Sequence, residues 1–540
     1  MTASSQDTST AVGRETWKVV VADGLPAEGL ASLRDISNLV VKDKWAPDDL
    51  KRELADADAL LVRSATKVTA DLLSSAKKLR VVGRAGVGVD NIDVKACTAR
   101  GIIVINSPEG NTVSAAEHTV ALILSLVRHI PAAHQSLAGG GWKRNQYVGT
   151  ELYKKAIGIV GLGKIGREVA ARLRSFQCRI LAYDPFLTEQ VARDLDVEIC
   201  DLNKLLEKAD IVTLHLPFSA ETNNLIGEAQ LKRMKPGARL INCARGGLVD
   251  EAALDAALKS GHIAGAAVDV FTQEPPDMSL PLLKNDKVVV TPHLGASTEE
   301  AQMRVAIDVC EQLRDMMHGR PARSPVNFPT LPAEQMAVLQ PFLSLAEKMG
   351  LLLSQTLDGT VQSVEILYSG EISKMKVAPV TNAALKGLLS PMMRETVNFV
   401  NAPHVAQERG IKVIESRSTE VRQYINLLSL KVTTDKVGKA CEGTLFGSEP
   451  RIVTLDGYRV EIIPQGVKLL TWQQDRPGVV GRVGTLLGTL NVNIAEMLLG
   501  RARVREKAIM VLSLDDAMKP EDVDKIKALD GIEDVRIAHL

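Results

Sequence analysis

Arg245, Glu274 and His293 are the side chains of this sequence best suited to do chemistry together. Each follows an apolar run that predicts a buried strand, and open α/β sheets bind their ligands beyond the carboxyl ends of such strands. A histidine can accept and return a proton near neutral pH, a carboxylate can orient the imidazole ring, and an arginine can hold a carboxylate with two parallel donors. Oxidation of a 2-hydroxy acid requires a base for the hydroxyl proton and a cation for the acid group. The three residues therefore predict a site for that reaction, if a hydride acceptor binds beside them.

A hydride acceptor is indicated by residues 157–166, which read IGIVGLGKIG. Gly161, Gly163 and Gly166 have the G-x-G-x-x-G spacing, and they stand between an apolar strand and a helical pattern, as in a dinucleotide-binding turn. A second apolar strand ends at Asp184, where a carboxylate can accept hydrogen bonds from the adenosine ribose and repel a 2′-phosphate. The pattern therefore predicts a Rossmann site that takes NAD in preference to NADP.

The elements that must position these residues alternate between strand and helix. Six apolar strands match the number in two βαβαβ halves: 157–160, 179–183, 211–214, 239–243, 266–269 and 288–291. Five more precede them and predict a separate small α/β domain: 18–21, 39–41, 59–62, 80–83 and 102–105. A helical pattern at 298–318, followed by three prolines in 319–329, marks the exit from the catalytic unit.

Two further domains are expected beyond residue 328. Residues 330–465 mix helical with β-rich patterns and have no catalytic spacing, which indicates a mixed α+β domain. Residues 467–540 follow the order βαββαβ of a ferredoxin-like unit. The expected division is a substrate-binding domain of 17–115 with 305–328, a Rossmann domain of 116–304, a mixed domain of 329–465 and a ferredoxin-like domain of 466–540.

The composition argues against several classes of partner. Lys plus Arg and Asp plus Glu both number 65, so no global charge attracts nucleic acid or an anionic membrane, and neither partner is expected. The six cysteines lie far apart with no C-x-x-C pair, which argues against structural zinc and disulfides, and no metal site is expected. The apolar run 119–127 is too short to span a bilayer, and residues 1–16 form a polar leader with one arginine and two acids. A cytoplasmic location is expected, with the plastid stroma as the alternative.

Several stretches resemble the D-isomer-specific 2-hydroxyacid dehydrogenases. They are NCARGGLVD at 242–250, AVDVFTQEPP at 267–276, TPHLGAST at 291–298, VRSATKVT at 62–69, GRAGVGVDN at 83–91 and WKRNQYVGTEL at 142–152. The resemblance covers residues 17–540, and it is closest to members that use NAD to oxidise 3-phospho-D-glycerate to 3-phosphohydroxypyruvate in L-serine synthesis. It implies an α/β architecture with a flavodoxin-like substrate-binding domain beside the Rossmann-type NAD-binding domain.

The resemblance also implies roles for individual residues. Arg245 would anchor the substrate carboxylate, His293 would be the acid/base and Glu274 its partner. The implied NAD contacts are Gly161, Gly163, Lys164, Ile165, Gly166, Asp184, Pro217, Ala244, Asp269, His293 and Gly295. The implied substrate contacts are Arg63, Arg84, Gly86, Val87 and, reaching from a second subunit, Arg144. These arginines suit a phosphorylated acid, whose second anion needs cationic donors, and ordinary surface ion pairs are the alternative.

The last two domains resemble the regulatory domains of long members of this family, an allosteric substrate-binding domain and an ACT domain, which senses amino acids. Asp475, the loop to Gly478 and Asn493 match an L-serine site, in which a helix N-terminus would receive the carboxylate of the amino acid. Gln473 departs from the aromatic residue that some long members carry two positions before this aspartate. Serine feedback and a homodimer or homotetramer are expected, with an ACT domain that serves assembly alone as the alternative.

Two other functions fit parts of the sequence. The three catalytic residues would serve equally well a dehydrogenase of hydroxypyruvate, glyoxylate or 2-oxoglutarate, and Arg63 and Arg84 are the features that discriminate against it. The second alternative is a dinucleotide-sensing protein that uses this fold to recruit partners. The appended regulatory domains argue against that class.

Overall fold

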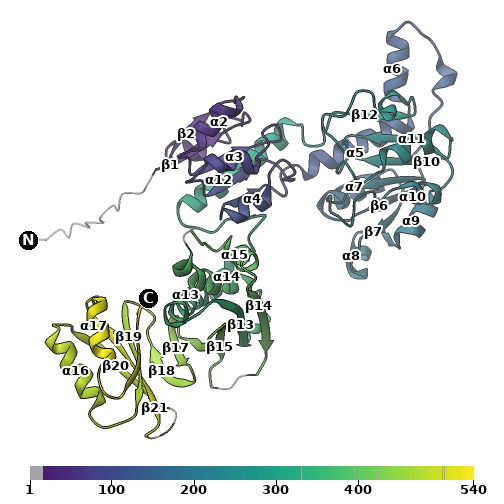
Figure 1. Ribbon diagram of the computed structural model, residues 1–540. Helices are drawn as coiled ribbons and strands as arrows, with labels where there is room; N and C mark the ends of the chain where they lie inside the picture. The colour runs from purple at the N-terminus through teal and green to yellow at the C-terminus, as the bar shows by residue number, and fades with distance from the viewer. Residues whose placement is uncertain are drawn as a thin grey trace, which may run out of the picture.

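The computed structural model describes residues 16–329, 331, 333–393, 396–420, 423–501, 503 and 505–540. They form four sheets, of five, seven, six and four strands. Figure 1 shows the corresponding units: an N-terminal unit, a central unit, an intermediate unit and a C-terminal unit, which lies farthest from the central one. The polar leader expected at 1–16 lies outside the described residues except for Thr16.

The N-terminal unit is a parallel five-stranded sheet in the order β2-β1-β3-β4-β5. This is the flavodoxin-like order, so that prediction is confirmed. Helix α12 returns to this unit from the central one and packs Val305, Ala306 and Val309 into its core. The elements are β1 (Trp17–Val21), α1 (Ala31–Arg34), β2 (Ser37–Val41), α2 (Pro47–Leu54), β3 (Ala59–Val62), α3 (Ala70–Ser75), β4 (Val81–Arg84), α4 (Val94–Ala99), β5 (Ile103–Asn106) and α12 (Glu299–Met317).

The central unit is a parallel seven-stranded sheet in the order β12-β11-β10-β9-β6-β7-β8. Because β6 pairs with both β7 and β9, the strand order reverses beside β6, where doubly wound sheets bind their ligands. The sequence predicts six of the strands; β8 is missed because it has only two residues and no apolar run. The elements are α5 (Thr112–Val127), α6 (Ile130–Ala138), η1 (Arg144–Gln146), β6 (Ala156–Val160), α7 (Lys164–Arg174), β7 (Arg179–Tyr183), α8 (Glu189–Asp194), β8 (Glu198–Ile199), α9 (Leu202–Lys208), β9 (Ile211–Leu214), α10 (Glu228–Arg233), β10 (Ala238–Asn242), α11 (Glu251–Lys259), β11 (Ile263–Val268), η2 (Pro281–Lys284) and β12 (Val288–Val290).

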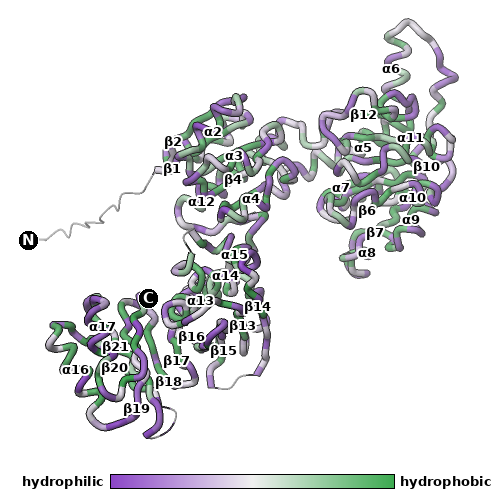
Figure 2. Tube along the Cα trace, in the orientation of Figure 1, coloured by the Kyte–Doolittle hydropathy of each residue, from purple (hydrophilic) through white to green (hydrophobic). Residues whose placement is uncertain are grey.

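Residues 130–150, called the arm below, project from the central unit (Figure 1). None of the residues of α6 is buried. The arm carries exposed apolar side chains, with Trp142 83% and Val148 78% exposed. The loop beyond α6 is otherwise largely hydrophilic, as Figure 2 shows. Exposed large apolar side chains on a projecting segment are typical of a surface that another chain covers.

The intermediate unit packs two helices on a sheet in the order β14-β13-β15-β16-β17-β18, in which β14 is parallel to β13 and the other pairs are antiparallel. By length and composition α13 could cross a membrane, a candidate that the sequence analysis missed. Its apolar side chains, among them Phe342, Leu345 and Met349, are buried in the core of this unit, which is the environment of a core helix. The elements are α13 (Ala333–Thr356), β13 (Val361–Gly370), η3 (Glu371–Lys374), α14 (Ala378–Leu389), η4 (Ser390–Met392), α15 (Ala402–Glu408), β14 (Lys412–Ser418), β15 (Asn426–Thr434), β16 (Gly438–Phe446), β17 (Glu449–Leu455) and β18 (Tyr458–Ile462).

The C-terminal unit has the predicted order βαββαβ, with an antiparallel sheet ordered β20-β21-β19-β22. Apolar residues of α16 and α17 pack on one face of this sheet. The other face contributes Leu470, Ile509 and Val511 to the core of the intermediate unit, so these two units share one continuous apolar core. The elements are β19 (Val467–Gln474), α16 (Val479–Thr489), β20 (Ile494–Arg501), β21 (Lys507–Leu514), α17 (Pro520–Lys527) and β22 (Ile532–His539).

Candidate active site

A cavity of about 330 Å³ lies beyond the carboxyl ends of β10 and β11 and brings together the three residues selected from the sequence. Arg245 follows β10, Glu274 follows β11 and His293 follows β12. The N-terminal unit contributes Asp90, so the cavity lies between that unit and the central one. The lining residues are Asp90, Phe218, Asn223, Arg245, Gly246, Gly247, Phe271, Thr272, Glu274 and His293.

His293 and Glu274 form a hydrogen-bonded pair, with 2.7 Å between Nδ1 and Oε2. Their side chains are 44% and 38% exposed, so the pair faces the cavity rather than the core. Burial raises the pKa of the Glu274 carboxyl, but the hydrogen bond and the charge of His293 outweigh burial, and the pKa lies below its ordinary value. Glu274 is therefore ionised at neutral pH. Because it holds Nδ1, the ring nitrogen left to exchange a proton with a substrate is Nε2.

The loop that carries His293 is held by the carboxylate of Asp269. Thr291 Oγ1 donates to it at 2.5 Å, the N–H of Leu294 at 2.7 Å and the N–H of Gly295 at 2.9 Å. His293 has a φ of +54°, a left-handed conformation that residues other than glycine adopt rarely and at a cost. Asp269 therefore fixes the backbone on both sides of a strained histidine, and its implied contact with NAD stays a prediction.

Asp269 is fully buried, and its carboxylate also meets His118 and Cys243. His118 Nε2 lies 3.3 Å from one oxygen and Cys243 Sγ lies 3.5 Å from the other. The three residues place metal-ligand atoms within 4.8 Å of one another. Burial raises the pKa of the Cys243 thiol, however, and a neutral thiol is a hydrogen-bond donor rather than a metal ligand. Burial also raises the pKa of Asp269, but hydrogen bonds from His118 and Thr291 outweigh it, so the pKa is lowered and the carboxylate is charged. The cluster is a hydrogen-bonded support for that charge.

Arg245 reaches across the cavity to Asp90, with 3.0 Å between Nε and Oδ2. Its Nη1 donates to the carbonyl oxygen of Ala244 at 2.6 Å. A Cβ at Gly88 would lie 2.3 Å from Nη2 of Arg245, so a larger residue at this position would displace the guanidinium. The guanidinium is thus positioned at the cavity, where it binds the carboxylate of Asp90, and its role as the anchor of a substrate carboxylate stays a prediction.

Arg84, the last residue of β4, is a second cation close to Arg245. Burial lowers the pKa of its guanidinium to about 10, and the charge of Arg245 acts in the same direction. Its Nε is buried and has no hydrogen-bond partner among the described residues. A Cβ at Gly86 would lie 1.8 Å from Nη1, so glycine makes room for this side chain. A buried donor without a partner costs about 1–3 kcal/mol, so an anion bound here would relieve that cost.

Arg63 and Val87 stand in the loops beside Arg84. Arg63 follows β3, its side chain is half-buried, and its charge contributes to lowering the pKa of Arg84 after the effects of burial and of Arg245. Its N–H donates to Oδ2 of Asp23 at 2.7 Å, which holds the loop. The carbonyl oxygen of Val87 accepts from the side chain of Asn106 at 2.5 Å. The predicted substrate residues of the N-terminal unit therefore lie at one edge of its sheet.

The glycine turn between β6 and α7 leaves room for a dinucleotide. Gly161 has a φ of +95°, and a Cβ at Gly166 would lie 2.2 Å from the carbonyl oxygen of Gly161, so both glycines are required by the packing of the turn. A Cβ at Gly163 would meet no atom within 4 Å, so the open side of the turn faces available space. No side chain of the described residues caps α7. The N–H groups of its first turn, which include those of Lys164 and Ile165, can therefore bind a pyrophosphate.

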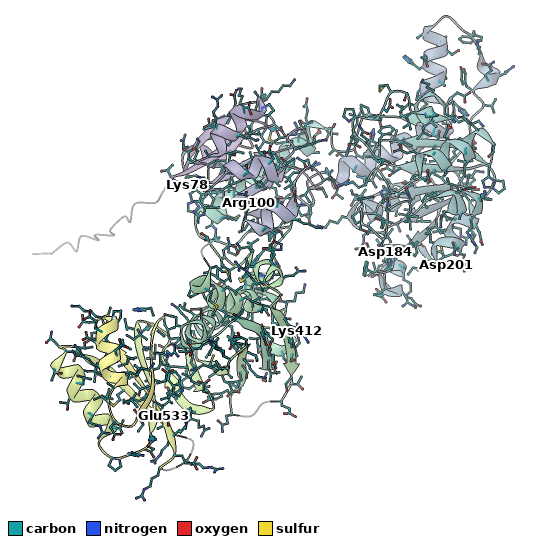
Figure 3. All side chains as sticks on the ribbon, viewed as in Figure 1. Lys78, Arg100, Asp184, Asp201, Lys412 and Glu533 are labelled. Atoms are coloured by element: carbon teal, nitrogen blue, oxygen red, sulfur yellow. The ribbon has the colours of Figure 1, made fainter. Side chains whose placement is uncertain are left out.

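Asp184 follows β7 beside this turn, and Figure 3 labels it on the central unit. Its two oxygens accept the N–H groups of Leu162 and Phe186, each at 2.9 Å. Each oxygen keeps a lone pair for a ribose hydroxyl. Pro217 and Ala244 follow β9 and β10 at the same edge of the sheet. The residues present at this edge fit NAD.

Arg144 lies apart from the cavity. It begins η1 in the arm, its side chain is exposed, and it is not among the residues that line the cavity. Within one chain the structure does not bring Arg144 to the active site. Its action from a second subunit stays a prediction.

Asp475 and Asn493, the predicted serine contacts, lie at opposite ends of the C-terminal sheet. Asp475 follows β19 and Asn493 precedes β20, and both strands are antiparallel to β21, so they run in the same direction. The eight residues of β19 span about 25 Å. Asp475 lies 3.6 Å from Arg501, and the side chain of Asn493 donates to Asp515 at 2.5 Å. Within one chain the structure therefore does not bring the two residues together, and their joint contact with serine stays a prediction. Gln473 is 2% exposed and accepts a hydrogen bond from a threonine of its own strand, so it faces the core.

Besides Gly246 and Gly247, five cavity residues were not selected from the sequence: Asp90, Phe218, Asn223, Phe271 and Thr272. Asp90 lies in the stretch 83–91 quoted for its resemblance, where a carboxylate between small residues was an available signal. Phe218 and Asn223 lie in the loop after β9, which has no recognisable spacing.

Three known domain families match successive parts of the chain. The pattern of the D-isomer specific 2-hydroxyacid dehydrogenase NAD binding domain matches residues 120–295, that of the D-3-phosphoglycerate dehydrogenase intervening domain matches 338–456, and that of the ACT domain matches 468–531. The chain is 45% identical over 519 residues to the D-3-phosphoglycerate dehydrogenase of Synechocystis, which covers 96% of this chain and 94% of the relative. It is 44% identical over 524 residues to that of Methanocaldococcus jannaschii, covering 97% and 100%. The crystal structure of D-lactate dehydrogenase from Aquifex aeolicus, complexed with NAD and lactic acid, matches with a TM-score of 0.53 and 28% identity, over 58% of this chain and 100% of that one.

Proposed function

The chain belongs to the D-3-phosphoglycerate dehydrogenase family, and on this premise we propose how its residues oxidise 3-phospho-D-glycerate with NAD to 3-phosphohydroxypyruvate, the first step of L-serine synthesis. The observation that carries the proposal is the cavity shared by the His293–Glu274 pair and Arg245, with Arg84 close by. A base, a carboxylate anchor and a second cation are the groups that a phosphorylated 2-hydroxy acid requires.

His293 accepts the proton of the C2 hydroxyl group at Nε2, while the C2–H bond breaks with its electron pair. NAD, when bound, supplies the hydride acceptor. Glu274 holds Nδ1 and stabilises the imidazolium that forms. Asp269 keeps the strained backbone of His293 in place during this transfer. The products are the 2-oxo acid, the reduced cofactor and one proton on the histidine.

Arg245 holds the substrate carboxylate by exchanging its bond to Asp90 for a bond to the substrate. Arg84 and Arg63 hold the phosphate, which supplies the partner that Nε of Arg84 lacks among the described residues. Displaced from Arg245, the Asp90 carboxylate turns to solvent, since its side chain is already 67% exposed. This exchange couples substrate binding to the contact between the N-terminal and central units.

The test is a steady-state comparison of kcat/KM for 3-phospho-D-glycerate with that for D-glycerate, D-lactate and D-2-hydroxyglutarate, with NAD. One charge-assisted contact contributes about 1.5–3 kcal/mol, so the phosphorylated acid should be preferred by at least about tenfold. A preference for an unphosphorylated acid would favour the 2-hydroxyacid dehydrogenase alternative. No turnover of any acid would favour the dinucleotide-sensing alternative.

The second subunit is proposed to cover the arm. Its exposed Trp142 and Val148, together with Leu137 at 58% exposure, form an apolar surface on a projecting segment. A symmetric contact between two such arms gives a dimer and carries Arg144 towards the neighbouring copy. Light scattering of the intact chain and of Trp142→Glu tests this, because the charge should shift the mass towards the monomer.

L-Serine is proposed to bind the C-terminal unit between two copies of the chain. Asp475 and Asn493 lie at opposite ends of one sheet. If two copies pack side by side around a two-fold axis, Asp475 of each copy would lie near Asn493 of the other, which gives two equivalent sites. The N-terminus of α16, next to Asp475, can accept the carboxylate of the amino acid. Serine would then act at a distance, by favouring the less active arrangement.

The domain division and the compartment are part of the same proposal. The packing of α12 on the N-terminal sheet supports a substrate-binding domain made of 17–115 and 305–328, followed by the divisions at 329 and 466. All six cysteines are free and five of them are buried, which supports a reducing compartment such as the cytoplasm.

A further inference from the structure

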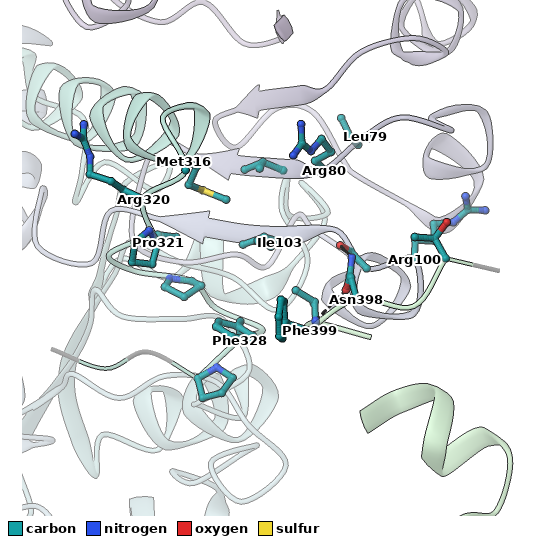
Figure 4. A pocket seen from close by; sticks show the side chains of 18 of the residues that line it. Leu79, Arg80, Arg100, Ile103, Met316, Arg320, Pro321, Phe328, Asn398 and Phe399 are labelled. Atoms are coloured by element: carbon teal, nitrogen blue, oxygen red, sulfur yellow. Dashed lines mark hydrogen bonds between the residues drawn. The ribbon is translucent and has the colours of Figure 1, made fainter. Parts of the chain in front are cut away.

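A second cavity, with a volume of about 660 Å³, lies between the N-terminal and intermediate units, at a distance from the active site. Figure 4 shows it from close by. Residues 77–81 and 100–103 of the N-terminal unit form one wall, residues 396–400 of the intermediate unit contribute to another, and the chain that joins the two units closes a third. The volume is within the range of about 300–1,000 Å³ that is typical of sites for organic ligands.

The charged residues that line this cavity are all cations. They are Lys77, Lys78, Arg80, Arg100 and Arg320, and no aspartate or glutamate lines it among the described residues. Arg320 pairs with Asp315, but the other four form no ion pair in the part of the chain that the structure describes. The whole chain has equal numbers of acidic and basic residues, so this is a local excess. Several cations around one concavity attract a polyanion.

The rest of the lining is apolar and aromatic. Phe328, Phe399 and Met316 contribute to it, and Figure 4 shows Arg320 and Arg100 to the left and right of the two phenylalanines, with their guanidinium groups directed away from the rings, and Arg80 above them. Such rings can stack on a planar heterocycle, with a contribution of about 1–3 kcal/mol for each base. A purely inorganic anion would leave them uncovered.

The cavity also contains the polar link between the two units. The side-chain N–H of Asn398 donates to the carbonyl oxygen of Gly101 at 2.8 Å. Asn398 Oδ1 accepts the N–H of Val400 at 2.9 Å, which fixes its orientation. A ligand here would touch the unit that binds substrate and the unit that carries the regulatory domains at the same time, and would favour the arrangement in which both walls contact it.

We propose that this cavity binds a nucleoside polyphosphate of the ATP class as a regulator of the enzyme, at a site separate from those of NAD and serine. The four cations that form no ion pair among the described residues match the several negative charges of a polyphosphate, whereas a fatty acid would use one of them. The phenylalanines match a planar base, and the second side-chain N–H of Asn398 can donate to it. The inference goes beyond the proposed dehydrogenase function and does not depend on its mechanism.

The test is calorimetric titration of the full chain with ATP while NADH saturates the cofactor site. The double variant Lys78→Glu with Arg100→Glu reverses two exposed cations of the cavity, which Figure 3 labels on the N-terminal unit. The matched control, Lys44→Glu with Lys95→Glu, reverses two exposed cations of the same unit outside the cavity. Loss of one or two charge-assisted contacts should weaken ATP binding by about tenfold or more in the cavity variant, with no change in the control.

Two further measurements locate the ligand and its base. Hydrogen exchange should slow in residues 77–81 and 398–400 together when ATP binds. Phe399→Leu should weaken ATP binding by about fivefold or more but leave tripolyphosphate binding unaffected, because it removes an aromatic face of the cavity and none of its cations. Absence of ATP binding at millimolar concentration would overturn the proposal, as would equal affinity for ATP and tripolyphosphate or retained affinity in the cavity variant. The dehydrogenase assay with 3-phospho-D-glycerate is independent of these outcomes.

Discussion

Replacement of Glu274 by glutamine removes the negative charge of the His293–Glu274 pair but keeps its hydrogen bond. The amide oxygen can still accept from Nδ1 at the present 2.7 Å, so the ring orientation is kept while the negative charge is lost. The two side chains are 44% and 38% exposed, so solvent screens the interaction and about 1 kcal/mol is a suitable magnitude. At 1.36 kcal/mol for each unit, this corresponds to about 0.7 pH unit. The sign follows from the reaction: oxidation needs a neutral base, and the interaction that lowers the pKa of the Glu274 carboxyl favours a charged partner, so its loss should extend activity to lower pH.

The assay is the profile of kcat/KM for 3-phospho-D-glycerate over about pH 5–9, whose acidic limb reports the base of the free enzyme. In Glu274→Gln this limb should move to lower pH by about 0.7 unit. Glu251→Gln is the matched control, because Glu251 accepts from the N–H of the cavity residue Thr272 at 2.7 Å and has no hydrogen bond to His293. A limb that stays in place, or moves to higher pH, would refute the reasoning.

Three further predictions concern the cofactor, the phosphate and the effector. Asp184→Ala should weaken NAD binding and reduce the preference for NAD over NADP. An unchanged ratio of the kcat/KM values for the two cofactors would contradict the assignment of Asp184 to the adenosine ribose. Arg84→Gln should lower kcat/KM for 3-phospho-D-glycerate by roughly 10- to 150-fold while sparing unphosphorylated acids. In the unmodified enzyme KM for this substrate should rise as the pH approaches the Arg84 pKa of about 10, since the guanidinium then loses its charge; equal losses for all acids would point to a folding role. Asn493→Ala should abolish calorimetric serine binding and serine inhibition without lowering kcat, and persistent inhibition would place the effector site elsewhere.

The strands and the cofactor turn could be predicted because their signals are local. An apolar run beside Gly161, Gly163 and Gly166 has few solutions other than a strand, a tight turn and a helix, and the structure confirms that order. β8 was missed because its two residues, a glutamate and an isoleucine, form no pattern. Pairing in that strand depends on its neighbour, β7, rather than on its own sequence.

The site was only partly predictable, because some of its contacts join segments that are distant in the chain. His293 and Glu274 could be paired from their positions after adjacent strands. The contact of Arg245 with Asp90 depends on how two units pack, and the role of Asp269 depends on a loop that folds back on its carboxylate. The separation of Asp475 from Asn493 within one chain has the same origin, because it depends on strand direction rather than on residue type.

The most direct test of the account is the rate of hydride transfer in a single turnover of His293→Asn. Asparagine tolerates the positive φ of this position better than most residues, so the loop should keep its conformation while the base is lost. Stopped-flow absorbance of NADH should show a rate lower by roughly 10²–10⁴ with 3-phospho-D-glycerate, and calorimetry should show that the variant still binds NAD. A near-normal rate in this variant would contradict the assignment of His293 as the acid/base and, with it, the mechanism proposed for the cavity.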